Sequence, residues 1–220
     1  VIYGTRRIAG NLVFAEANDG EAGSGNDFLH LIFLVASHEV HSFDSFLINE
    51  DVVTLDSDGF VEQDKYKSGS TSFVRLLTAN GTDDQIANST LVTESANWTT
   101  NHRLRGIAYI YARLKFSNDI FPNGIPNITS IVKGKKVYDP RTSSTSFSTN
   151  SALCVRDFLT NTRYGLGANS TEINDTIFTS AANTCDETVT LASPTSQTFN
   201  SETSVDSSAN TIQINGHQLE

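Results

Sequence analysis

The chain has 220 residues, of which 38% are hydrophobic, and its formal net charge is −10 at pH 7. This length suffices for one large domain or two small ones, each with its own core. The acidic balance argues against broad nucleic-acid binding, which requires a basic face. The longest apolar run, 28–36, falls short of the roughly 18 residues that a membrane-spanning helix needs.

The sequence contains no methionine and begins at Val1 inside a strand-like pattern. It also stops in strand-like alternation, at 210–220. We therefore expect the chain to be a piece of a longer polypeptide, with removal of an N-terminal segment as the alternative.

Cys154 and Cys185 are the only cysteines, and they lack the close spacing of zinc ligands. We expect two small buried residues, with a single disulfide bridge as the alternative. Asn-x-Ser/Thr sequons would suggest glycosylation, but we attribute them to chance in a chain rich in Asn, Ser and Thr. They begin at Asn80, Asn88, Asn97, Asn127, Asn169 and Asn174.

The first third of the chain predicts strands. Two β segments bent at Gly10-Asn11 are expected in 1–17, followed by a loop at 18–27. The apolar run 28–36 predicts a strand covered on both faces, within which His30 is expected to be a core histidine with satisfied hydrogen bonds. A hairpin is expected at 45–55, turning at 49–51.

The middle of the chain predicts strand, helix and strand. Residues 71–81 form a strand pattern that ends at Asn80-Gly81. Thr82 is expected to cap a short amphipathic helix at 83–95. The alternation over 101–119 predicts one long strand.

Three of the four prolines and four of the fifteen Lys and Arg residues lie between 122 and 145. Prolines predict a rigid connector at 121–127. A hairpin with Gly134 in its turn is expected at 128–140, and its exposed tip would carry Lys133, Lys135 and Lys136. This tip is either a solvated turn or a protrusion that docks on an acidic neighbour; in the second case, substitution of the lysines by Glu is expected to leave the domain folded.

Past Pro140 we expect a polar link and then two helices. The first, at 151–165, would be capped by Thr149, Asn150 or Ser151 and followed by Gly165. The second, at 169–185, would be capped by Ser170 or Thr171. Its apolar stripe is predicted to be Ile173, Ile177, Phe178 and Ala181. Residues 186–220 are poor in large apolar side chains and predict exposed strands and loops, or a segment that packs on a partner outside this chain.

Patterns for catalysis or metal binding are weak. His38 and His41 are three residues apart, but in a strand they would point to opposite faces. Adjacent acids could suggest a glycosidase, yet turns and helix starts explain them better. These acids are Glu50 with Asp51, Asp56 with Asp58, and Asp83 with Asp84. We therefore predict no catalytic residue, no cofactor and no metal site.

Three ordered strings carry a resemblance: "WTTNHRLRGIAYIYARLKF", "FPNGIPNITSIVKGKKVYDPRT" and "NSALCVRDFLTNTRYGLG". Together with 1–17 and 28–53 they resemble the tail-tip (host-specificity, tip-attachment) proteins of long-tailed bacteriophages and prophages. The resemblance covers roughly 1–185, and its most specific part runs from the KGKK motif to Gly167.

The resemblance implies a structural, non-enzymatic role in the virion, in a protein made in the bacterial host cytoplasm. Such proteins form a homotrimeric hub that closes the tail tube and contacts other tail-tube and tail-tip proteins. Phage DNA passes through without specific binding, and regions beyond this chain contact the host receptor. The rivals are a ligand- or glycan-binding module of a surface protein and an enzyme that degrades cell-wall polymer.

We predict an α+β fold with mixed or antiparallel sheets and a small two-helix unit. One β-rich hub domain is expected at 1–121, with a helix near 83–95. A second part, 122–220, would hold the basic hairpin, the two helices and the terminal strands, unless both parts form one composite domain.

Overall fold

The computed structural model describes residues 1–19, 26–188, 203–206, 211–214 and 217–219. The chain divides into two compact units, Val1–Cys185 and Asp186–Glu220. In the second unit, three strands pair antiparallel in a sheet of their own: β13 (Thr203–Asp206), β14 (Thr211–Ile214) and β15 (His217–Leu219). Residues 1–121 and 122–185 thus lie in one unit.

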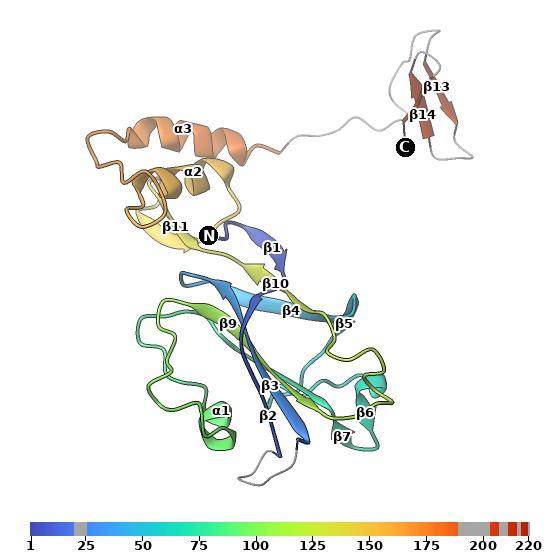
Figure 1. The fold of residues 1–220 in the computed structure, drawn as a ribbon. Coiled ribbons are helices and arrows are strands. Elements are labelled where there is room, and N and C mark those ends of the chain that lie inside the picture. Colours follow the sequence, from blue (N-terminus) through green and yellow to red (C-terminus); the bar gives the residue numbers. More distant parts are fainter. Residues whose placement is uncertain (20–25, 189–202, 207–210, 215–216, 220) are drawn as a thin grey trace. The chain divides into compact units, whose positions relative to one another are not determined.

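The first unit contains two four-stranded antiparallel sheets (Figure 1). The β1 sheet has the order β1 (Thr5–Ile8), β10 (Ile128–Lys133), β4 (Ser42–Ile48) and β5 (Asp51–Val53). The β2 sheet has the order β2 (Asn11–Asn18), β3 (Phe28–Ala36), β9 (Ala108–Lys115) and β8 (Val74–Ala79). The bend predicted at Gly10-Asn11 therefore carries the chain from one sheet to the other. The α+β class is confirmed.

The main core lies between the two sheets. Alternate residues of β9, namely Ile110, Ala112 and Leu114, pack there with Leu31 of β3 and Phe46 of β4. This follows from the period of two along a strand, which sends every second side chain to the same face. The strand predicted at 28–36 is covered on both faces, because Ile32 and Leu34 enter a second core on the other side of the sheet.

The second core covers the outer face of the β2 sheet. Tyr109 and Tyr111 of β9 and Ile32 of β3 pack there against Leu91 and Trp98. Leu91 belongs to α1 (Ser89–Glu94), whose N-cap Asn88 accepts a hydrogen bond from the Leu91 amide. The short helix is thus capped by Asn88 and packs on the sheet through Leu91.

A helical layer packs on a short β pair, β11 (Lys136–Asp139) and β12 (Ser144–Phe147). It consists of α2 (Ser151–Thr160) and α3 (Asp175–Cys185), and its small core contains Val137, Leu153 and Ala182. Asn150, one of the three predicted caps, accepts hydrogen bonds from the first amides of α2. The two-helix unit is therefore confirmed, and the remaining short elements are β6 (Lys67–Ser68), β7 (Thr71–Ser72) and the 3-10 turn Asp64–Tyr66.

The helix predicted at 83–95 is shorter than expected, and Thr82 does not cap it. The Gln85 side chain takes the place of a first helical turn. It accepts from the Gly81 amide and donates to the carbonyl oxygens of Arg103 and Leu104. These bonds tie 81–87 to the loop before β9, which itself shortens the strand predicted at 101–119. Leu104 in that loop has a φ of 50°, outside the β region.

The hairpin predicted at 128–140 is wrong. β10 pairs with β1 and β4, whereas β11 pairs with β12. The apolar arms resemble each other in sequence, but each satisfies its backbone hydrogen bonds with a different partner. The link predicted at 141–150 consequently contains a strand, β12, because β11 needs an antiparallel neighbour.

Three further details of the C-terminal part differ from prediction. The helix expected from 169 begins at Asp175, because the Asn174 side chain accepts from the amides of Thr176 and Ile177. Its buried residue is Ala182, while Ile177 is 64% exposed. Both cysteines are free, and Cys185 is exposed rather than buried.

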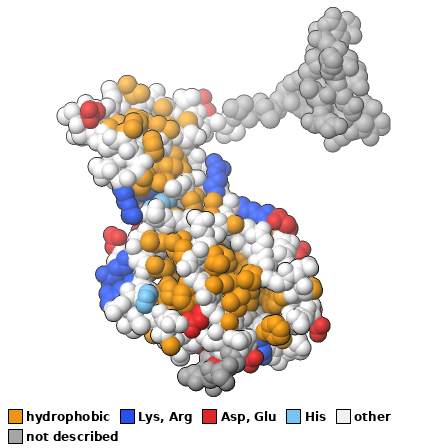
Figure 2. Space-filling view, viewed as in Figure 1, with side chains coloured by type: hydrophobic (Ala, Val, Ile, Leu, Met, Phe, Trp, Pro, Cys, Tyr) orange, Lys and Arg blue, Asp and Glu red, His pale blue; other side chains and the backbone are white. Residues whose placement is uncertain are grey.

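No helix of the described residues is long and apolar enough to cross a membrane. Figure 2 shows hydrophobic side chains gathered on the helical layer and on the sheet region of the first unit. Exposed apolar residues of the helical layer include Val155, Phe158 and Ile177.

Candidate functional site

The lysine cluster, defined as Lys133, Lys135 and Lys136, lies at the joint between β10 and β11. Each lysine forms an ion pair within the chain. Lys133 pairs with Asp44 at 2.9 Å, Lys135 with Asp157 at 2.8 Å and Lys136 with Glu39 at 2.8 Å. The cluster does meet acidic neighbours, as one of the predicted readings required, but they belong to the same chain.

Gly134 explains why the joint is so tight. Its amide donates to the Gly4 carbonyl, and the next amide, of Lys135, donates to the Ile2 carbonyl. A Cβ atom at Gly134 would lie 2.2 Å from the Ile2 carbonyl oxygen, closer than any real contact. A side chain therefore cannot fit here, and Gly134 is required by close packing rather than by a hairpin turn.

Asp157 of α2 is the centre of the joint. Its carboxylate accepts from Lys135 Nζ at 2.8 and 2.9 Å, from Tyr3 Oη at 2.5 Å and from Tyr164 Oη at 3.2 Å. We call these four residues the Asp157 cluster. It joins the segment before β1, the β10–β11 joint and α2, and it fixes the helical layer on the sheets.

The electrostatics of the cluster favour the paired state. Burial and the hydrogen bond to Asp157 raise the pKa of Tyr3 well above its ordinary range. Burial alone would lower the pKa of Lys135, but the hydrogen bonds to Asp157 and Tyr164 outweigh it and raise that pKa. Tyr3 and Lys135 thus stay protonated at neutral pH and donate to one carboxylate, an arrangement that stabilises rather than reacts.

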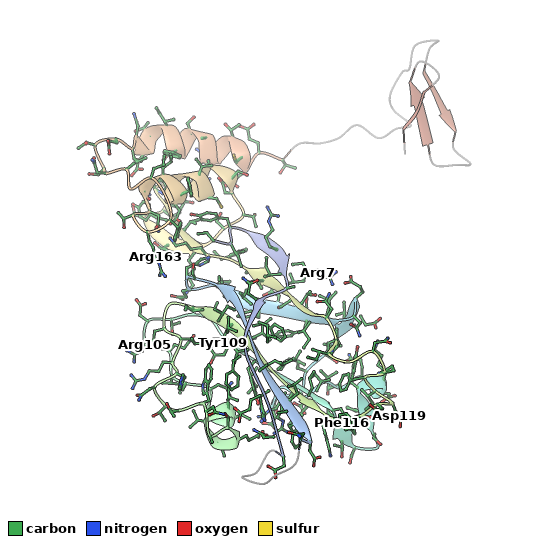
Figure 3. The ribbon with its side chains drawn as sticks, viewed as in Figure 1. Arg7, Arg105, Tyr109, Phe116, Asp119 and Arg163 are labelled. Carbon is green, nitrogen blue, oxygen red and sulfur yellow. The ribbon has the colours of Figure 1, made fainter. Side chains whose placement is uncertain are left out.

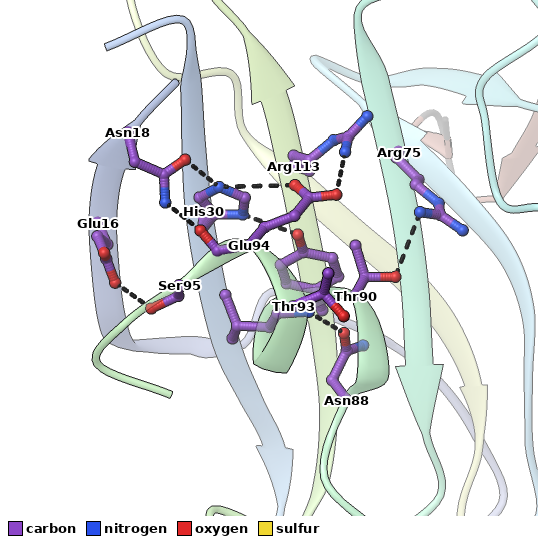
Figure 4. A network of polar contacts seen from close by, with 12 residues as sticks. Glu16, Asn18, His30, Arg75, Asn88, Thr90, Thr93, Glu94, Ser95 and Arg113 are labelled. Carbon is purple, nitrogen blue, oxygen red and sulfur yellow. Dashed lines mark hydrogen bonds and ion pairs between the residues drawn. The ribbon is translucent and has the colours of Figure 1, made fainter. Parts of the chain in front are cut away.

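A second polar cluster lies beneath α1 on the outer face of the β2 sheet (Figure 4). His30 is fully buried; its Nδ1 lies 2.8 Å from Tyr111 Oη and its Nε2 lies 2.9 Å from Asn18 Oδ1. Because the Asn18 amide nitrogen donates to the Glu94 carbonyl, its oxygen faces His30, which therefore carries its proton on Nε2. Burial lowers the pKa of His30, so the ring is neutral. The prediction of a satisfied core histidine is confirmed.

Glu94, the last residue of α1, fastens the helix to the sheet. Its Oε1 forms an ion pair with Arg113 of β9, and its Oε2 is buried 3.9 Å from His30 Nε2. Directly after α1, its C-cap residue Ser95 donates to Glu16 of β2. These contacts link α1 and its C-cap to β2, β3 and β9. A further contact reaches the fourth strand, because Arg75 of β8 donates to Thr90 of the helix.

Most of the neighbouring acids noted in the sequence are held by ion pairs or by hydrogen bonds within turns. Glu50, at a φ of 73° in the β4–β5 turn, pairs with Arg7 of β1, which Figure 3 labels. Asp51 pairs with Lys65. Asp56 accepts from the amides of Asp58 and Phe60. The Thr82 side chain hydrogen-bonds Asp84 and lowers its pKa.

The histidines of the HEVH motif have structural contacts. His38 Nε2 accepts from the Ile2 amide at 2.9 Å, and its Nδ1 lies 2.7 Å from the Glu39 carbonyl oxygen. The His41 ring stacks on Phe147, with centroids 5.4 Å apart. Within the part of the chain that the structure describes, no three His, Cys, Asp or Glu side chains gather to hold a metal ion.

Sequence reasoning missed Asp157 and Tyr3. Asp157 lies in the middle of a helix pattern, where an acid is normally solvated, and Tyr3 lies near the start of the chain. The signal that could have found them is Lys135 itself, because a lysine beside a glycine in a tight joint loses solvent and needs a carboxylate.

No protein-family model and no curated protein matches the chain. Among solved structures, it is similar to a chain described as "Virion of native gene transfer agent (GTA) particle", with 17% sequence identity and a TM-score of 0.39. The match covers 60% of this chain and 25% of that one, so this chain spans far less than the length of the protein it matches.

Proposed function

We propose that the chain is a non-enzymatic structural component of a phage tail tip, a hub segment that closes or continues the tail tube and supports host attachment. The observation that carries the proposal is the resemblance of residues 98–167 to tail-tip proteins. These residues supply β9 and β10, interior strands of the two sheets, and α2, which contributes Asp157. The resemblance thus lies on the elements that hold the first unit together.

Charge and rigidity are consistent with this role. A surface of net charge −10 repels phosphates within a Debye length of about 8 Å at physiological salt, as suits a passage that must not retain DNA. The paired carboxylates described above are engaged in turns and ion pairs, which is what a scaffold needs. In the full-length protein, the hub would be a homotrimer in contact with other tail proteins, and regions beyond this chain would contact the host receptor.

Immunogold electron microscopy tests the location. Antibodies raised against the purified chain should label one end of the tail on particles from a strain that encodes it. A strain with the coding segment deleted is the control and should show no label. Labelling confined to heads or to cell envelopes would contradict the proposal.

Light scattering across a concentration series tests the assembly. A mass of three chains supports the homotrimer directly. A mass of one chain at every concentration would argue against a trimer interface within these 220 residues and assign it to other parts of the protein.

A further inference from the structure

The outer face of the β2 sheet carries a row of residues in direct register. Glu16 faces His30, His30 faces Arg113, Arg113 faces Arg75, and Arg75 forms a bridge with Phe60. α1 covers the end of the row at Glu16 and His30 through Ser95 and Glu94. Figure 4 shows Arg75 and Arg113 beside each other at the other end.

Two arginines directly opposite each other on one face of a sheet repel and destabilise the pair. Arg113 is compensated by Glu94. Arg75 donates only to neutral oxygens, the Asp58 carbonyl at 2.7 Å and the Thr90 hydroxyl at 3.2 Å. Among the described residues it has no carboxylate partner, so part of the positive charge in this row is left uncompensated.

Arg113 lines a pocket of about 330 Å³. Lys115, two residues further along β9, and Lys67, in the β6–β7 hairpin, also line it. Neither lysine forms an ion pair with any residue the structure describes. Hydroxyl groups of the same hairpin complete the wall. They belong to Ser70, Thr71 and Ser72.

Aromatic rings hold these cations in position. The Arg113 guanidinium lies 4.5 Å from the centroid of Phe28, Arg75 lies 4.9 Å from that of Phe60, and Lys115 Nζ lies 5.5 Å from that of Phe73. Because each ring already packs against a cation, the rings are not free platforms for stacking nucleobases. They preorganise positive charge beside the pocket.

We propose that this basic pocket, defined by Lys67, Arg113, Lys115 and the hydroxyls of 70–72, binds a phosphate group, either free or in a phosphate ester. The Ser72 hydroxyl already donates to the Val74 carbonyl. The remaining donors, two ammonium groups, a guanidinium edge and the hydroxyls of Ser70 and Thr71, exceed what a carboxylate can accept, whereas a phosphate accepts on three or four oxygens. The volume lies at the lower end for small-molecule sites, roughly 300–1,000 Å³, and accommodates a phosphate with one attached group.

One acidic group lies on the pocket wall, and removal of its negative charge tests whether the pocket binds an anion. Asp56 lines the pocket, and its Oδ1 accepts from the amides of Asp58 and Phe60. Asp56→Asn keeps an acceptor oxygen for these amides and removes one negative charge. It should therefore tighten phosphate binding while leaving the turn intact.

The experiment is calorimetric titration of the whole chain with inorganic phosphate, with glycerol 3-phosphate and with a short oligothymidylate, at low and at physiological salt. The double variant Lys67→Ala/Lys115→Ala should bind phosphate roughly tenfold more weakly or worse, and Asp56→Asn roughly twofold more tightly. Lys65→Ala is the matched control, since it removes one positive charge nearby from a lysine that already pairs with Asp51. The Lys65→Ala variant should bind phosphate with the affinity of the wild type.

The three probes separate the sources of the phosphate. Binding of phosphate or glycerol 3-phosphate that depends on Lys67 and Lys115 supports the pocket, and tighter binding of the oligothymidylate with the same dependence assigns it to a nucleic-acid backbone. Absence of binding by all three probes at millimolar concentration overturns the proposal. An equal loss in Lys65→Ala also overturns it, because the effect would then be one of net charge. The single variant Lys67→Ala, on an exposed hairpin, decides the matter if the double variant fails to fold.

Discussion

The lysine cluster and the basic pocket both concentrate positive charge in a chain of net charge −10, but in different ways. In the lysine cluster, three cations within four residues each meet a carboxylate of the same chain. In the basic pocket, cations from separate segments converge, and only Arg113 has an acidic partner among the described residues.

This difference shows that clustering in sequence does not predict availability. The partners of the lysine cluster, Asp44, Glu39 and Asp157, lie far away along the chain and are brought in by sheet pairing and by α2. Lys67 and Lys115 have no such partner because the β6–β7 hairpin and the end of β9 face each other across a hollow. Whether a lysine gains a carboxylate partner therefore depends on which strands and helices pack together, not on its neighbours in the sequence.

Asp157→Ala should have the largest effect on the lysine cluster. The carboxylate and Lys135 are largely buried, with side-chain exposures of 15% and 22%, so the variant leaves a cation and two hydroxyls without their acceptor. We expect a loss of about 3 kcal/mol in the free energy of unfolding. Urea denaturation followed by circular dichroism measures it. For the same reason Lys135→Glu should unfold the helical layer, contrary to the sequence-based expectation for a tip that docks on an acidic neighbour. A loss below about 0.5 kcal/mol would show that the Asp157 cluster is not an anchor.

Glu94→Gln should have the next largest effect, and it carries the comparison to the basic pocket, because Glu94 is the acidic partner of Arg113. The change keeps the size of the side chain but removes the charge that faces Arg113 and His30. We expect a loss of about 2 kcal/mol in stability, since Arg113 loses its buried counter-ion. The basic pocket should meanwhile gain affinity for phosphate, because Arg113 is no longer neutralised. Unchanged affinity would place Arg113 outside the binding site.

Much of the fold was predictable because its signals are local. Alternation and apolar runs identified β3, β4, β5 and β8, and a candidate cap at 149–151 followed by an apolar face identified α2. The β4–β5 turn was expected, and Asn49 and Glu50 do adopt positive φ there. These elements depend on nearest neighbours and on period, which the sequence carries directly.

The errors share one physical cause, competition by partners distant in sequence. β10 and β11 satisfied a hairpin pattern locally, but Thr5–Ile8 and Ser144–Phe147 offered better-aligned edges. Gln85 replaced a helical turn by bonding to a loop 18 residues or more away. The Asp157 cluster and the basic pocket could not be predicted for the same reason, because their members meet only after the sheets have paired.

Alkaline pH should weaken the Asp157 cluster. The pKa of Tyr3 is raised above its ordinary 10.0 and that of Lys135 above 10.5, so both hold their protons more tightly in the folded state. The stabilisation is therefore complete below about pH 10 and is lost as the pH rises above it. Tyr3→Phe should cost about 1 kcal/mol at pH 8 and reduce the loss between pH 9 and pH 11. Part of the loss of stability at alkaline pH should remain in this variant, because burial also raises the pKa of Tyr111. A variant with the same slope as the wild type would exclude Tyr3 as a contributor.

The smallest effects should come from the two outer lysines of the cluster, and they sharpen the comparison with the basic pocket. Lys133 and Lys136 are 38% and 42% exposed in their side chains, so solvent screens their ion pairs with Asp44 and Glu39. Lys133→Ala or Lys136→Ala should each change stability by less than about 0.5 kcal/mol, as should Lys67→Ala. Phosphate affinity should separate the three variants, because only Lys67 lacks a carboxylate partner within the described residues and lines the pocket. If Lys133→Ala weakened phosphate binding as much as Lys67→Ala, the intramolecular ion pairs would not neutralise the lysine cluster, and the distinction between the two regions would be lost.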